Sequence, residues 1–373
     1  MRLLICGGGT GGHIYPALAL ARYALEQDPA TEILFVGTEQ GSESKIVPGA
    51  AFKLATIPAR GYRRNLKQLA PVAREAFRGL TRARQILREF NPHIVLGTGG
   101  YVSAPVVLAA AMARKPTVIH EQNALPGLAN RYLAPLATRV CLSFAESGRR
   151  FSRFSRTELT GNPRASEVAA ASGSEGIKRL GLDPRLQTVV VYGGSRGALK
   201  INKVMIEFIK MGWLPAQTQL VYITGEQYYQ DVVEQLGRLP GTIRLLPYLN
   251  DMPPLLAAAD LAVTRSGATT LAEITALGLP AILIPSPNVV NNHQYYNARL
   301  LADAGAALLI EENQFNHFRL KRELEHFFSG TGVREKMIRS SRKLGIPDAA
   351  ARLYRCLTEI VNSRSGKANT TRK

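Results

Sequence analysis

The stretch Leu261-Ala-Val-Thr-Arg-Ser-Gly-Ala-Thr-Thr-Leu-Ala-Glu273 predicts a buried strand that runs directly into a helix. Ser266 is a suitable N-cap, and apolar residues then recur at helical spacing. Gly267 and Ala268 carry almost no side chain, so the N–H groups of the first helical turn stay open to an anion such as phosphate. Glu273 follows one turn later, where a carboxylate could accept hydrogen bonds from two vicinal ribose hydroxyls.

Strand-and-helix units of this kind recur along the whole chain. The apolar runs that predict strands lie at residues 3–6, 33–36, 53–57, 94–96, 117–120, 140–143, 188–192, 219–224, 242–246, 261–264, 281–285 and 307–310. Because helical patterns separate these runs, we expect parallel sheets with helices on both faces. A chain of 373 residues exceeds the size at which one core stops growing. The predicted fold class is therefore α/β, with two tandem Rossmann-like, doubly wound domains that face a cleft.

The predicted domain boundary lies near Gly161-Asn-Pro163, where the strand pattern restarts. We expect an amino-terminal domain at 1–163, a carboxyl-terminal domain at 164–345, and a helix at about 346–362 that packs back on the first domain. Residues 165–176 are rich in Ala, Ser and Gly, which is typical of a connection or hinge. Residues 363–373 have no periodicity and are expected to form a disordered tail.

Each predicted domain opens with a strand that runs into a glycine-rich loop. These loops are Gly7-Gly-Gly-Thr-Gly-Gly-His13 and Gly193-Gly-Ser-Arg-Gly-Ala198. Ligands of doubly wound sheets bind at the carboxyl ends of the strands, so both loops are expected to line a binding site. The first loop also fits the dinucleotide pattern G-x-G-x-x-G, with Glu39 in the place of the ribose-binding acid. That alternative is disfavoured, because a nicotinamide enzyme needs neither a second phosphate loop nor the helix start that follows Thr264.

Two polar side chains at strand ends are candidates for a general base. His13 closes the first glycine loop at the start of a helix, and Glu121 lies in His120-Glu-Gln-Asn123, directly after a buried strand. The alternatives are a capping or packing histidine and a polar loop with a helix cap. The spacing alone does not decide between His13 and Glu121.

The net charge of the chain favours an anionic partner. Lys and Arg exceed Asp and Glu by 47 − 28 = +19, and residues 60–90 contain nine of these cations and two Glu. Apolar residues recur at helical spacing in this segment, which predicts a basic amphipathic helix on an anionic membrane surface; the alternative is a surface helix whose apolar stripe is core. A second basic and aromatic cluster lies at 149–156. A nucleic-acid partner would also account for the charge, but no base-stacking platform or nucleic-acid-binding motif is evident.

Three further features narrow the class of protein. Cys6, Cys141 and Cys356 are far apart without C-x-x-C pairing, which favours a reducing compartment and argues against a structural zinc site. The first residues do not resemble a signal peptide, and the longest apolar stretch, 102–113, is too short to span a bilayer. No Asp-x-Asp occurs, so we expect N–H groups, hydroxyls and Arg to meet phosphate charge without a metal.

Seven short motifs stand in a fixed order along the chain. They are Gly8-Gly-Thr-Gly-Gly-His13, Gly99-Gly-Tyr101, His120-Glu-Gln-Asn123, Gly161-Asn-Pro-Arg164, Gly193-Gly-Ser195, Arg265-Ser-Gly-Ala268 with Glu273, and His293-Gln-Tyr-Tyr-Asn297. From residue 2 to about residue 360, the chain thereby resembles the MurG family of peptidoglycan N-acetylglucosaminyltransferases, which convert lipid I to lipid II. The resemblance implies a GT-B fold and an inverting transfer of GlcNAc from UDP-GlcNAc to the 4-hydroxyl of the muramyl sugar of lipid I.

The same resemblance implies a set of site residues. Glu273 would hold the ribose, Leu249 and Met252 would flank the uracil, and His293 and Gln294 would contact the sugar hydroxyls. Ser195, Arg164 and Thr270 would meet the diphosphate, and Asn123 would contact the transferred sugar. The residues expected to contact UDP-GlcNAc are Thr10, Gly11, Gly12, Asn123, Arg164, Ser195, Leu249, Met252, Ala268, Thr269, Thr270, Glu273, His293 and Gln294. The residues expected to contact the acceptor are Gly8, Gly9, Thr10, Gly11, Gly12, His13 and Tyr101.

The resemblance also implies partners and a location. UDP-GlcNAc is a substrate, and neither a cofactor nor a metal is expected. The expected partners are undecaprenyl-linked lipid I, anionic phospholipid of the inner leaflet, and other cell-wall and division proteins, with no nucleic acid. We therefore expect a peripheral protein on the cytoplasmic face of the bacterial cell membrane. A diacylglycerol glycosyltransferase and a UDP-GlcNAc epimerase remain as alternatives of the same fold, and the epimerase should lack the basic amphipathic helix.

Overall fold

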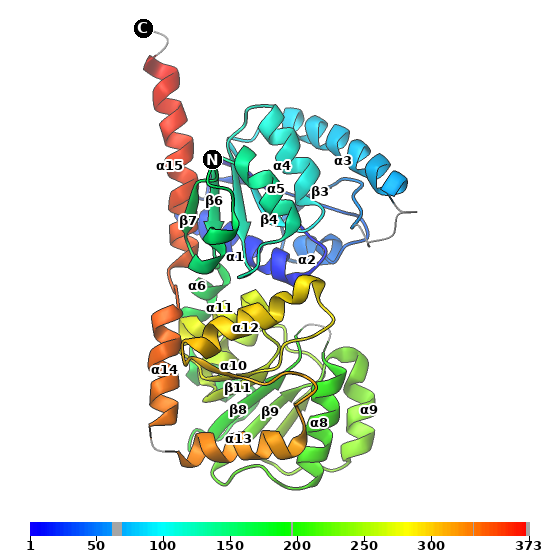
Figure 1. Cartoon of the computed structure of the whole chain (residues 1–373), viewed down its shortest axis with the longest axis vertical. Coiled ribbons are helices and arrows are strands. Elements are labelled where there is room, and N and C mark those ends of the chain that lie inside the picture. Colours follow the sequence, from blue (N-terminus) through cyan, green and yellow to red (C-terminus); the bar gives the residue numbers. More distant parts are fainter. Residues whose placement is uncertain (62–68, 195–196, 331, 371–373) are drawn as a thin grey trace. The chain divides into compact units, whose positions relative to one another are not determined.

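The computed structural model describes residues 1–61, 69–194, 197–330 and 332–370. The chain forms two compact units, shown in Figure 1. Unit 1 contains Met1–Arg164 and Asp348–Lys373, and unit 2 contains Ala165–Pro347. The chain therefore passes from one unit to the other twice, after Arg164 and after Pro347, and the second passage returns the last helix to unit 1.

Unit 1 contains a seven-stranded parallel sheet in the order β3-β2-β1-β4-β5-β6-β7. Its strands are β1 (Arg2–Gly7), β2 (Glu32–Gly37), β3 (Lys53–Thr56), β4 (Ile94–Gly99), β5 (Thr117–Glu121), β6 (Arg139–Leu142) and β7 (Thr157–Leu159). The order reverses between β1 and β4, which is the switch point where doubly wound sheets bind ligands. The predicted fold is confirmed for this unit. The edge strand β7 was not predicted, because its three residues, Thr-Glu-Leu, form no apolar run.

Helices cover both faces of the first sheet. They are α1 (Gly11–Gln27), α2 (Glu43–Gly49), α3 (Leu69–Phe90), α4 (Ser103–Met112), α5 (Leu128–Leu133) and α15 (Ala349–Thr370), with short 3₁₀ turns η2 (Ala134–Leu136) and η3 (Ala145–Arg150). Leu4 and Cys6 of β1 share one core with α3, α4 and α5. Leu3 and Ile5, which point to the other face, share a second core with α1, α2 and α15. Burial on both faces explains why these strands are continuous apolar runs.

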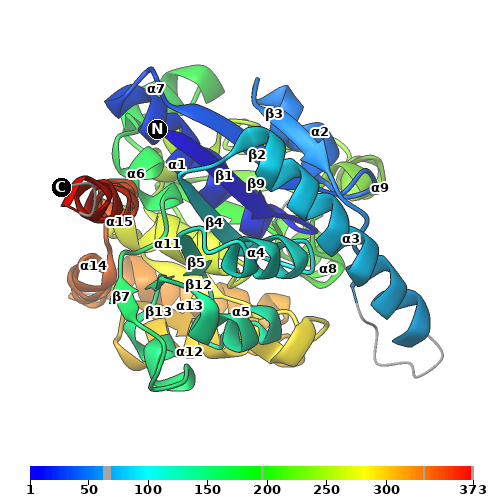
Figure 2. The same ribbon diagram turned by 90° about the horizontal axis from the view of Figure 1, so that it is seen from above.

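The basic helix α3 is packed into unit 1 at one end and exposed at the other. Ala83, Ile86 and Leu87 near its carboxyl end are buried in the core below the helix. Arg74, Phe77 and Arg78 nearer its amino end are exposed, and this end extends past α4 in Figure 2. The predicted apolar stripe is therefore core over one half of the helix and surface over the other. The rest of the basic segment, residues 62–68 with Leu66 among them, lies outside the described residues.

The last helix, α15, belongs to unit 1 and packs on α1. Leu353 and Leu357 enter the core that contains Leu3 and Ile5, and the buried Cys356 sulfur lies 3.6 Å from that of Cys141 on β6. The prediction of a disordered tail at 363–373 is wrong as far as Thr370, because α15 continues to that residue. Backbone hydrogen bonds within the helix, and a bond of 2.7 Å from Arg364 Nη1 to Arg114 O, hold this extension without an apolar stripe.

Unit 2 contains a six-stranded parallel sheet in the order β10-β9-β8-β11-β12-β13. Its strands are β8 (Gln187–Tyr192), β9 (Thr218–Ile223), β10 (Ile243–Leu246), β11 (Leu261–Thr264), β12 (Ala281–Leu283) and β13 (Ala307–Leu309). This order repeats that of the first six strands of unit 1, with the switch point between β8 and β11. All six strands were predicted, and the second doubly wound domain is confirmed.

The helices of unit 2 also cover both faces of its sheet. They are α6 (Arg164–Ala169), α7 (Gly173–Leu180), α8 (Leu199–Lys210), α9 (Glu226–Leu236), α10 (Met252–Ala258), α11 (Ala268–Leu277), α12 (His293–Asp303), α13 (His317–Ser329) and α14 (Val333–Leu344), with the 3₁₀ turn η4 (Val290–Asn292). The segment 165–176, expected to form a connection, directly follows the passage from unit 1 to unit 2, and it contains most of α6 and the start of α7. Its small residues permit close packing: a Cβ on Gly176 would lie 2.2 Å from Pro254 O of α10.

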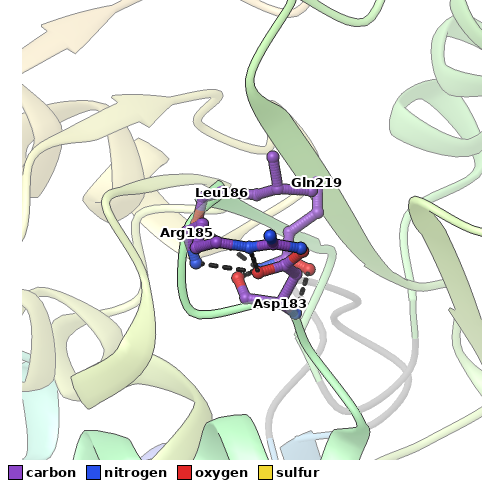
Figure 3. Close-up of polar contacts among 4 residues, drawn as sticks. All are labelled: Asp183, Arg185, Leu186 and Gln219. Atoms are coloured by element: carbon purple, nitrogen blue, oxygen red, sulfur yellow. Dashed lines mark hydrogen bonds and ion pairs between the residues drawn. The ribbon is translucent and has the colours of Figure 1, made fainter.

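The turn that leads into β8 is closed by a network of polar side chains, shown in Figure 3. Gln219 accepts a hydrogen bond of 3.0 Å from Asp183 N and donates bonds of 2.9 Å to Asp183 O and 3.0 Å to Thr188 Oγ1. The Arg185 side chain donates to both oxygens of the Asp183 carboxylate, and these bonds lower the pKa of Asp183 to about 2. This network lies at the amino end of the sheet, away from the strand ends where ligands bind.

Candidate active site

A buried carboxylate supports the glycine loop that follows β1. Glu43, at the start of α2, accepts hydrogen bonds of 2.9 Å from Gly9 N, 2.9 Å from Thr38 N and 2.7 Å from Thr38 Oγ1. These donors lower the pKa of Glu43, although burial, the largest single influence, opposes them. Glu43 was not among the site residues predicted from the sequence. In this part of the chain the dinucleotide pattern points instead to Glu39 as the ribose-binding acid. Glu39 is exposed, and its carboxylate lies 3.5 Å from Thr56 Oγ1.

The position of Glu43 limits what the first glycine loop can bind. Because the carboxylate takes the Gly9 N–H and Gly8 is buried, an incoming anion meets the exposed Thr10 and Gly12 at the start of α1. The first turn of α1 contains no acidic side chain, and Thr10 makes no capping bond with its side chain. This helix start therefore suits a phosphate group. Tyr101 borders the glycine loop, since its ring lies 3.1 Å from a Cβ built on Gly9.

The hydrogen bonds of His13 determine which of its nitrogens holds a proton. Nδ1 lies 3.0 Å from Gly8 O and 3.3 Å from Thr10 Oγ1. A carbonyl oxygen only accepts hydrogen bonds, so Nδ1 of the neutral ring carries the proton and donates it to Gly8 O. Nε2 then holds the lone pair. A neutral imidazole fixed in this tautomer is suited to accept a proton at Nε2.

Glu121, the second candidate base, is surrounded by donors. Its side chain is 1% exposed, and its oxygens accept hydrogen bonds from Asn123 N (2.9 Å), Gly127 N (3.0 Å), Asn130 Nδ2 (2.8 Å) and Asn123 Nδ2 (3.4 Å). Burial raises the pKa of Glu121, and these donors oppose that effect. The carboxylate thus holds together the loop between β5 and α5. Asn123, a predicted sugar contact, is held at the rim by this arrangement.

Arg164 stands at the end of unit 1 rather than within unit 2. Its backbone N–H donates to Asn162 Oδ1 at 3.1 Å, and its guanidinium lies 5.9 Å from the centre of the Tyr15 ring on α1. The side chain is half-buried. This places a cation on the same unit as the glycine loop and His13.

In unit 2, the helix start after β11 is anchored by side chains from α12. The N-cap of α11 is Gly267, so the prediction of Ser266 at this position is wrong by one residue. The Ser266 hydroxyl donates instead to Gln294 O at 2.8 Å, and the buried Asn297 Nδ2 donates to Ser266 O at 3.2 Å. The two motifs at 265–273 and 293–297 are thus brought together at the carboxyl edge of the second sheet.

The helix start of α11 has the properties expected of a phosphate site. Its first turn contains no acidic residue, and the half-buried Thr269 and Thr270 place hydroxyls there. Glu273 lies one turn further, 8% exposed. Burial and, next, the Glu273 carboxylate raise the pKa of Tyr192, which places Glu273 beside the carboxyl end of β8. Arg265 points elsewhere: it forms an ion pair with Glu312 and donates to Ile284 O at 3.1 Å.

The two predicted sugar contacts lie at the start of α12. His293 Nδ1 donates to Val290 O at 2.9 Å, which leaves Nε2 as an acceptor, and burial lowers the pKa of His293. Gln294 Oε1 accepts from Ser286 N at 2.9 Å. A cavity of about 390 Å³ adjoins this segment, lined by Lys200, Pro285, Asn292, Tyr295, Glu311 and Glu312 among others.

Three further residues of unit 2 were predicted to contact UDP-GlcNAc. Leu249 and Met252 are half-buried on either side of the start of α10, close in sequence to the end of β10. Ser195, predicted to meet the diphosphate, lies outside the described residues, as does Arg196. In the part of the chain that the structure describes, no three His, Cys, Asp or Glu side chains gather as a metal would require, and no helix is long and apolar enough to cross a membrane.

Family models and curated relatives match nearly the whole chain. Residues 3–142 match the glycosyltransferase family 28 N-terminal domain, and residues 188–353 match the glycosyltransferase family 28 C-terminal domain. A protein of Lacticaseibacillus casei, named UDP-N-acetylglucosamine--N-acetylmuramyl-(pentapeptide) pyrophosphoryl-undecaprenol N-acetylglucosamine transferase, is 42% identical over 98% of this chain and 100% of its own length. A protein of the same name from Lactococcus lactis subsp. cremoris is 43% identical over 97% of this chain and 100% of its own length.

Solved structures share the architecture. The crystal structure of Acinetobacter baumannii MurG is similar with a TM-score of 0.74 and 25% identity, over 96% of this chain and 99% of that one. A UDP-GlcNAc 2-epimerase from Neisseria meningitidis, bound to UDP-GlcNAc, has a TM-score of 0.66 at 14% identity, over 96% of this chain and 100% of that one. At that identity the epimerase is similar in fold alone.

Proposed function

The chain belongs to glycosyltransferase family 28, and within that family we propose that it transfers N-acetylglucosamine from UDP-N-acetylglucosamine to lipid I, forming lipid II. The observation that carries this function is the full-length similarity to transferases of that name, at 42% identity over 98% of the chain. It is an N-acetylglucosaminyltransferase of peptidoglycan synthesis. The epimerase alternative is supported only by a similarity in fold, because the UDP-GlcNAc 2-epimerase from Neisseria meningitidis is 14% identical to this chain.

Unit 2 is assigned the nucleotide sugar. The amino-terminal turn of α11 takes the diphosphate, with the Thr269 and Thr270 hydroxyls beside it, and Glu273 accepts hydrogen bonds from the ribose hydroxyls. Leu249 and Met252 flank the uracil. His293 accepts a sugar hydroxyl at Nε2, since its Nδ1–H is engaged by Val290 O. Gln294 is held by Ser286 N at one end and contributes its amide N–H to the sugar.

Unit 1 is assigned the lipid-linked acceptor. The start of α1, at Thr10–Gly12, takes the acceptor diphosphate, because Glu43 already uses the Gly9 N–H. Tyr101 borders this loop, Asn123 contacts the transferred sugar, and Arg164 supplies a cation to a phosphate.

His13 is the base we propose. The oxygen of the acceptor 4-hydroxyl attacks the anomeric carbon of GlcNAc from the face opposite UDP, and UDP leaves with the electrons of the broken C–O bond, which gives inversion. The hydroxyl proton passes to His13 Nε2, whose lone pair is set by the Nδ1–H bond to Gly8 O. Glu121 is less suited, since four donors surround its buried carboxylate. The start of α11 stabilises charge on the departing phosphate.

Incubation of the purified protein with UDP-GlcNAc and a short-chain lipid I analogue tests the function. We expect UDP release coupled to formation of the disaccharide product, and no reaction with UDP-glucose or diacylglycerol. The same assay with excess EDTA tests the proposal that no metal takes part, and the rate should be unchanged. Transfer to diacylglycerol, or release of N-acetylmannosamine from UDP-GlcNAc alone, would replace this function by one of its alternatives.

We also propose that unit 1 docks on anionic phospholipid of the inner leaflet. Phe77 on α3 is 70% exposed and Tyr132 on α5 is 78% exposed, and both helices cover the same face of the first sheet. Met112 at the end of α4, on this face, is also exposed and lies 3.3 Å from Arg84 Nη2. Exposed apolar side chains beside Arg74 and Arg78 suit shallow insertion combined with attraction to anionic headgroups.

Charge reversal of α3 tests this docking surface. Changing Arg74, Arg78 and Arg82 to Glu should weaken binding to vesicles that contain anionic lipid, since each cation near such a surface contributes about 1 kcal/mol. The matched control changes Lys203, Lys210 and Arg339 of unit 2 to Glu, so that both variants carry the same net charge, 19 − 6 = +13. Sedimentation with vesicles across a salt series should separate the variants. If the α3 variant and the unit 2 control lost vesicle binding equally, the net charge of the protein alone would explain the effect, and α3 would not be the docking surface.

A further inference from the structure

Gln122 has a buried side-chain oxygen that no hydrogen bond uses among the described residues. The residue follows β5 and is 2% exposed. Its Nε2 donates to Thr98 O at 2.6 Å and to His120 Nδ1 at 3.1 Å, whereas its Oε1 has no partner. A buried acceptor without a partner destabilises a fold, so its presence in a folded protein requires an explanation.

The surroundings of Gln122 determine which end of its amide is the oxygen. His120 Nε2 lies 2.9 Å from Gly161 O, so Nε2 carries the proton and Nδ1 is an acceptor. Thr98 O is also an acceptor. Both groups therefore require N–H donors, and the amide nitrogen of Gln122 must face them. The oxygen is turned away from both, and reversal of the amide would place it against two acceptors.

The oxygen of Gln122 and the proposed base face the same small space above Gly99. A Cβ built on Gly99 would lie 3.1 Å from His13 Nε2 and 3.6 Å from Gln122 Oε1. Gly99 has a φ of 104°, and its missing side chain keeps this space open. The unsatisfied acceptor thus lies close to the nitrogen that holds the lone pair of His13.

We propose that Gln122 is a positioning residue for His13, and that its Oε1 stabilises the imidazolium that forms when His13 takes the proton of the acceptor hydroxyl. The inference rests on the proposed role of His13 as base. In the neutral ring, Nδ1–H donates to Gly8 O and Nε2 is unprotonated. After the O–H bond of the sugar breaks, Nε2 also carries a proton, and this N–H donates to Gln122 Oε1 once the product oxygen withdraws. Gln122 Oε1, which accepts no hydrogen bond in the resting enzyme, therefore accepts one when His13 is an imidazolium.

The sign of the effect follows from this arrangement. Loss of the oxygen destabilises the imidazolium, so the pKa of His13 should fall, the acid limb of the kcat profile should move to lower pH, and the plateau rate should fall. Titratable or charged groups of the elements packed around the His13 loop are Glu43, which binds Gly9 N, His120 on β5, Tyr101 beside Gly9, and, further along α1, Tyr15 with Arg164 over its ring. All of them remain in the variant. Burial mainly lowers the pKa of His120 to about 4; the hydrogen bond to Gly161 O opposes this effect, and the charge of His13 adds to it.

Gln122→Leu is the test, with Gln219→Leu as the matched control. Gln219 is likewise buried and donates through Nε2 to a carbonyl and a second polar group, but it lies in unit 2. Histidines labelled with ¹⁵N are titrated by NMR and assigned with His13→Gln, and kcat is measured against pH with a short-chain acceptor. In Gln122→Leu we expect the pKa of His13 to fall by about one unit, kcat to fall about tenfold, and the KM for UDP-GlcNAc to change less than about twofold. Gln219→Leu should change none of these.

Two results would overturn the proposal. One is an unchanged pKa of His13 in folded Gln122→Leu. The other needs no variant: a wild-type spectrum in which neutral His120 carries its proton on Nδ1 would remove one of the two acceptors that fix the orientation of the Gln122 amide, and with it the placement of the oxygen toward His13. Neither readout depends on turnover, so a failure of the proposed transfer reaction would show itself separately in the activity assay.

Discussion

His13→Gln is expected to lower kcat by about 10²–10⁴ while leaving the affinity for UDP-GlcNAc nearly unchanged. Glutamine retains a group that can donate to Gly8 O, as Nδ1 does at 3.0 Å, so the glycine loop should keep its shape. It supplies no group that accepts a proton near neutral pH. The acid limb of the pH profile should therefore disappear with the activity. Stopped assays with a short-chain acceptor between pH 5 and pH 9 measure both effects.

His326→Gln, a change at an exposed histidine of α13, is the control and should behave as the wild type. Glu121→Gln separates the second candidate base. Because four donors converge on this carboxylate, an amide would place its own NH₂ against donors, and we expect a lower melting temperature with a smaller effect on kcat. A stable Glu121→Gln protein with no activity, beside an active His13→Gln, would exchange the two roles.

The fold could be predicted because buried parallel strands form unbroken apolar runs. Strands such as Leu261–Thr264 are covered on both faces, so the pattern needs no knowledge of distant contacts. β7 was missed because an edge strand of three residues is set by its pairing with β6, not by its own composition. The extension of α15 to Thr370 was missed because residues 363–370 have no apolar residues at helical spacing, unlike the predicted part of the helix, which buries Leu353 and Leu357.

The geometry of the candidate site could be predicted where a sequence motif determines its own backbone conformation, and less well where it depends on tertiary partners. A glycine loop between a strand and a helix predicts a phosphate site from local backbone alone. Nothing in the sequence reveals that Glu43 takes the Gly9 N–H, that Ser266 bonds to Gln294 O and not to its own helix, or that Gln122 faces His13. These contacts join residues that are distant along the chain, and only the folded sheet brings them together.

Glu273→Gln is expected to weaken UDP binding by about 10–150-fold, which corresponds to about 1.5–3 kcal/mol for the loss of a hydrogen bond to a charged group. The carboxylate presents two acceptor oxygens to vicinal ribose hydroxyls, whereas an amide presents one oxygen and a donor that the hydroxyls must turn to meet. Glu273 is 8% exposed at the edge of the second sheet, so the replacement has the same shape in a nearly dry site. Calorimetric titration with UDP measures the change.

A comparison of UDP with 2′-deoxy-UDP tests the contact between Glu273 and the ribose hydroxyls more directly. If Glu273 reads the ribose hydroxyls, Glu273→Gln should lower the affinity for UDP strongly and that for 2′-deoxy-UDP only slightly, because the deoxy nucleotide has already lost one of the two donors. Glu335→Gln, a change at an exposed carboxylate in the first turn of α14, removes the same charge from unit 2 and should leave both affinities as they are. An equal loss of affinity for UDP and 2′-deoxy-UDP would mean that Glu273 contacts protein groups such as Tyr192 at the end of β8. Another residue would then bind the ribose hydroxyls.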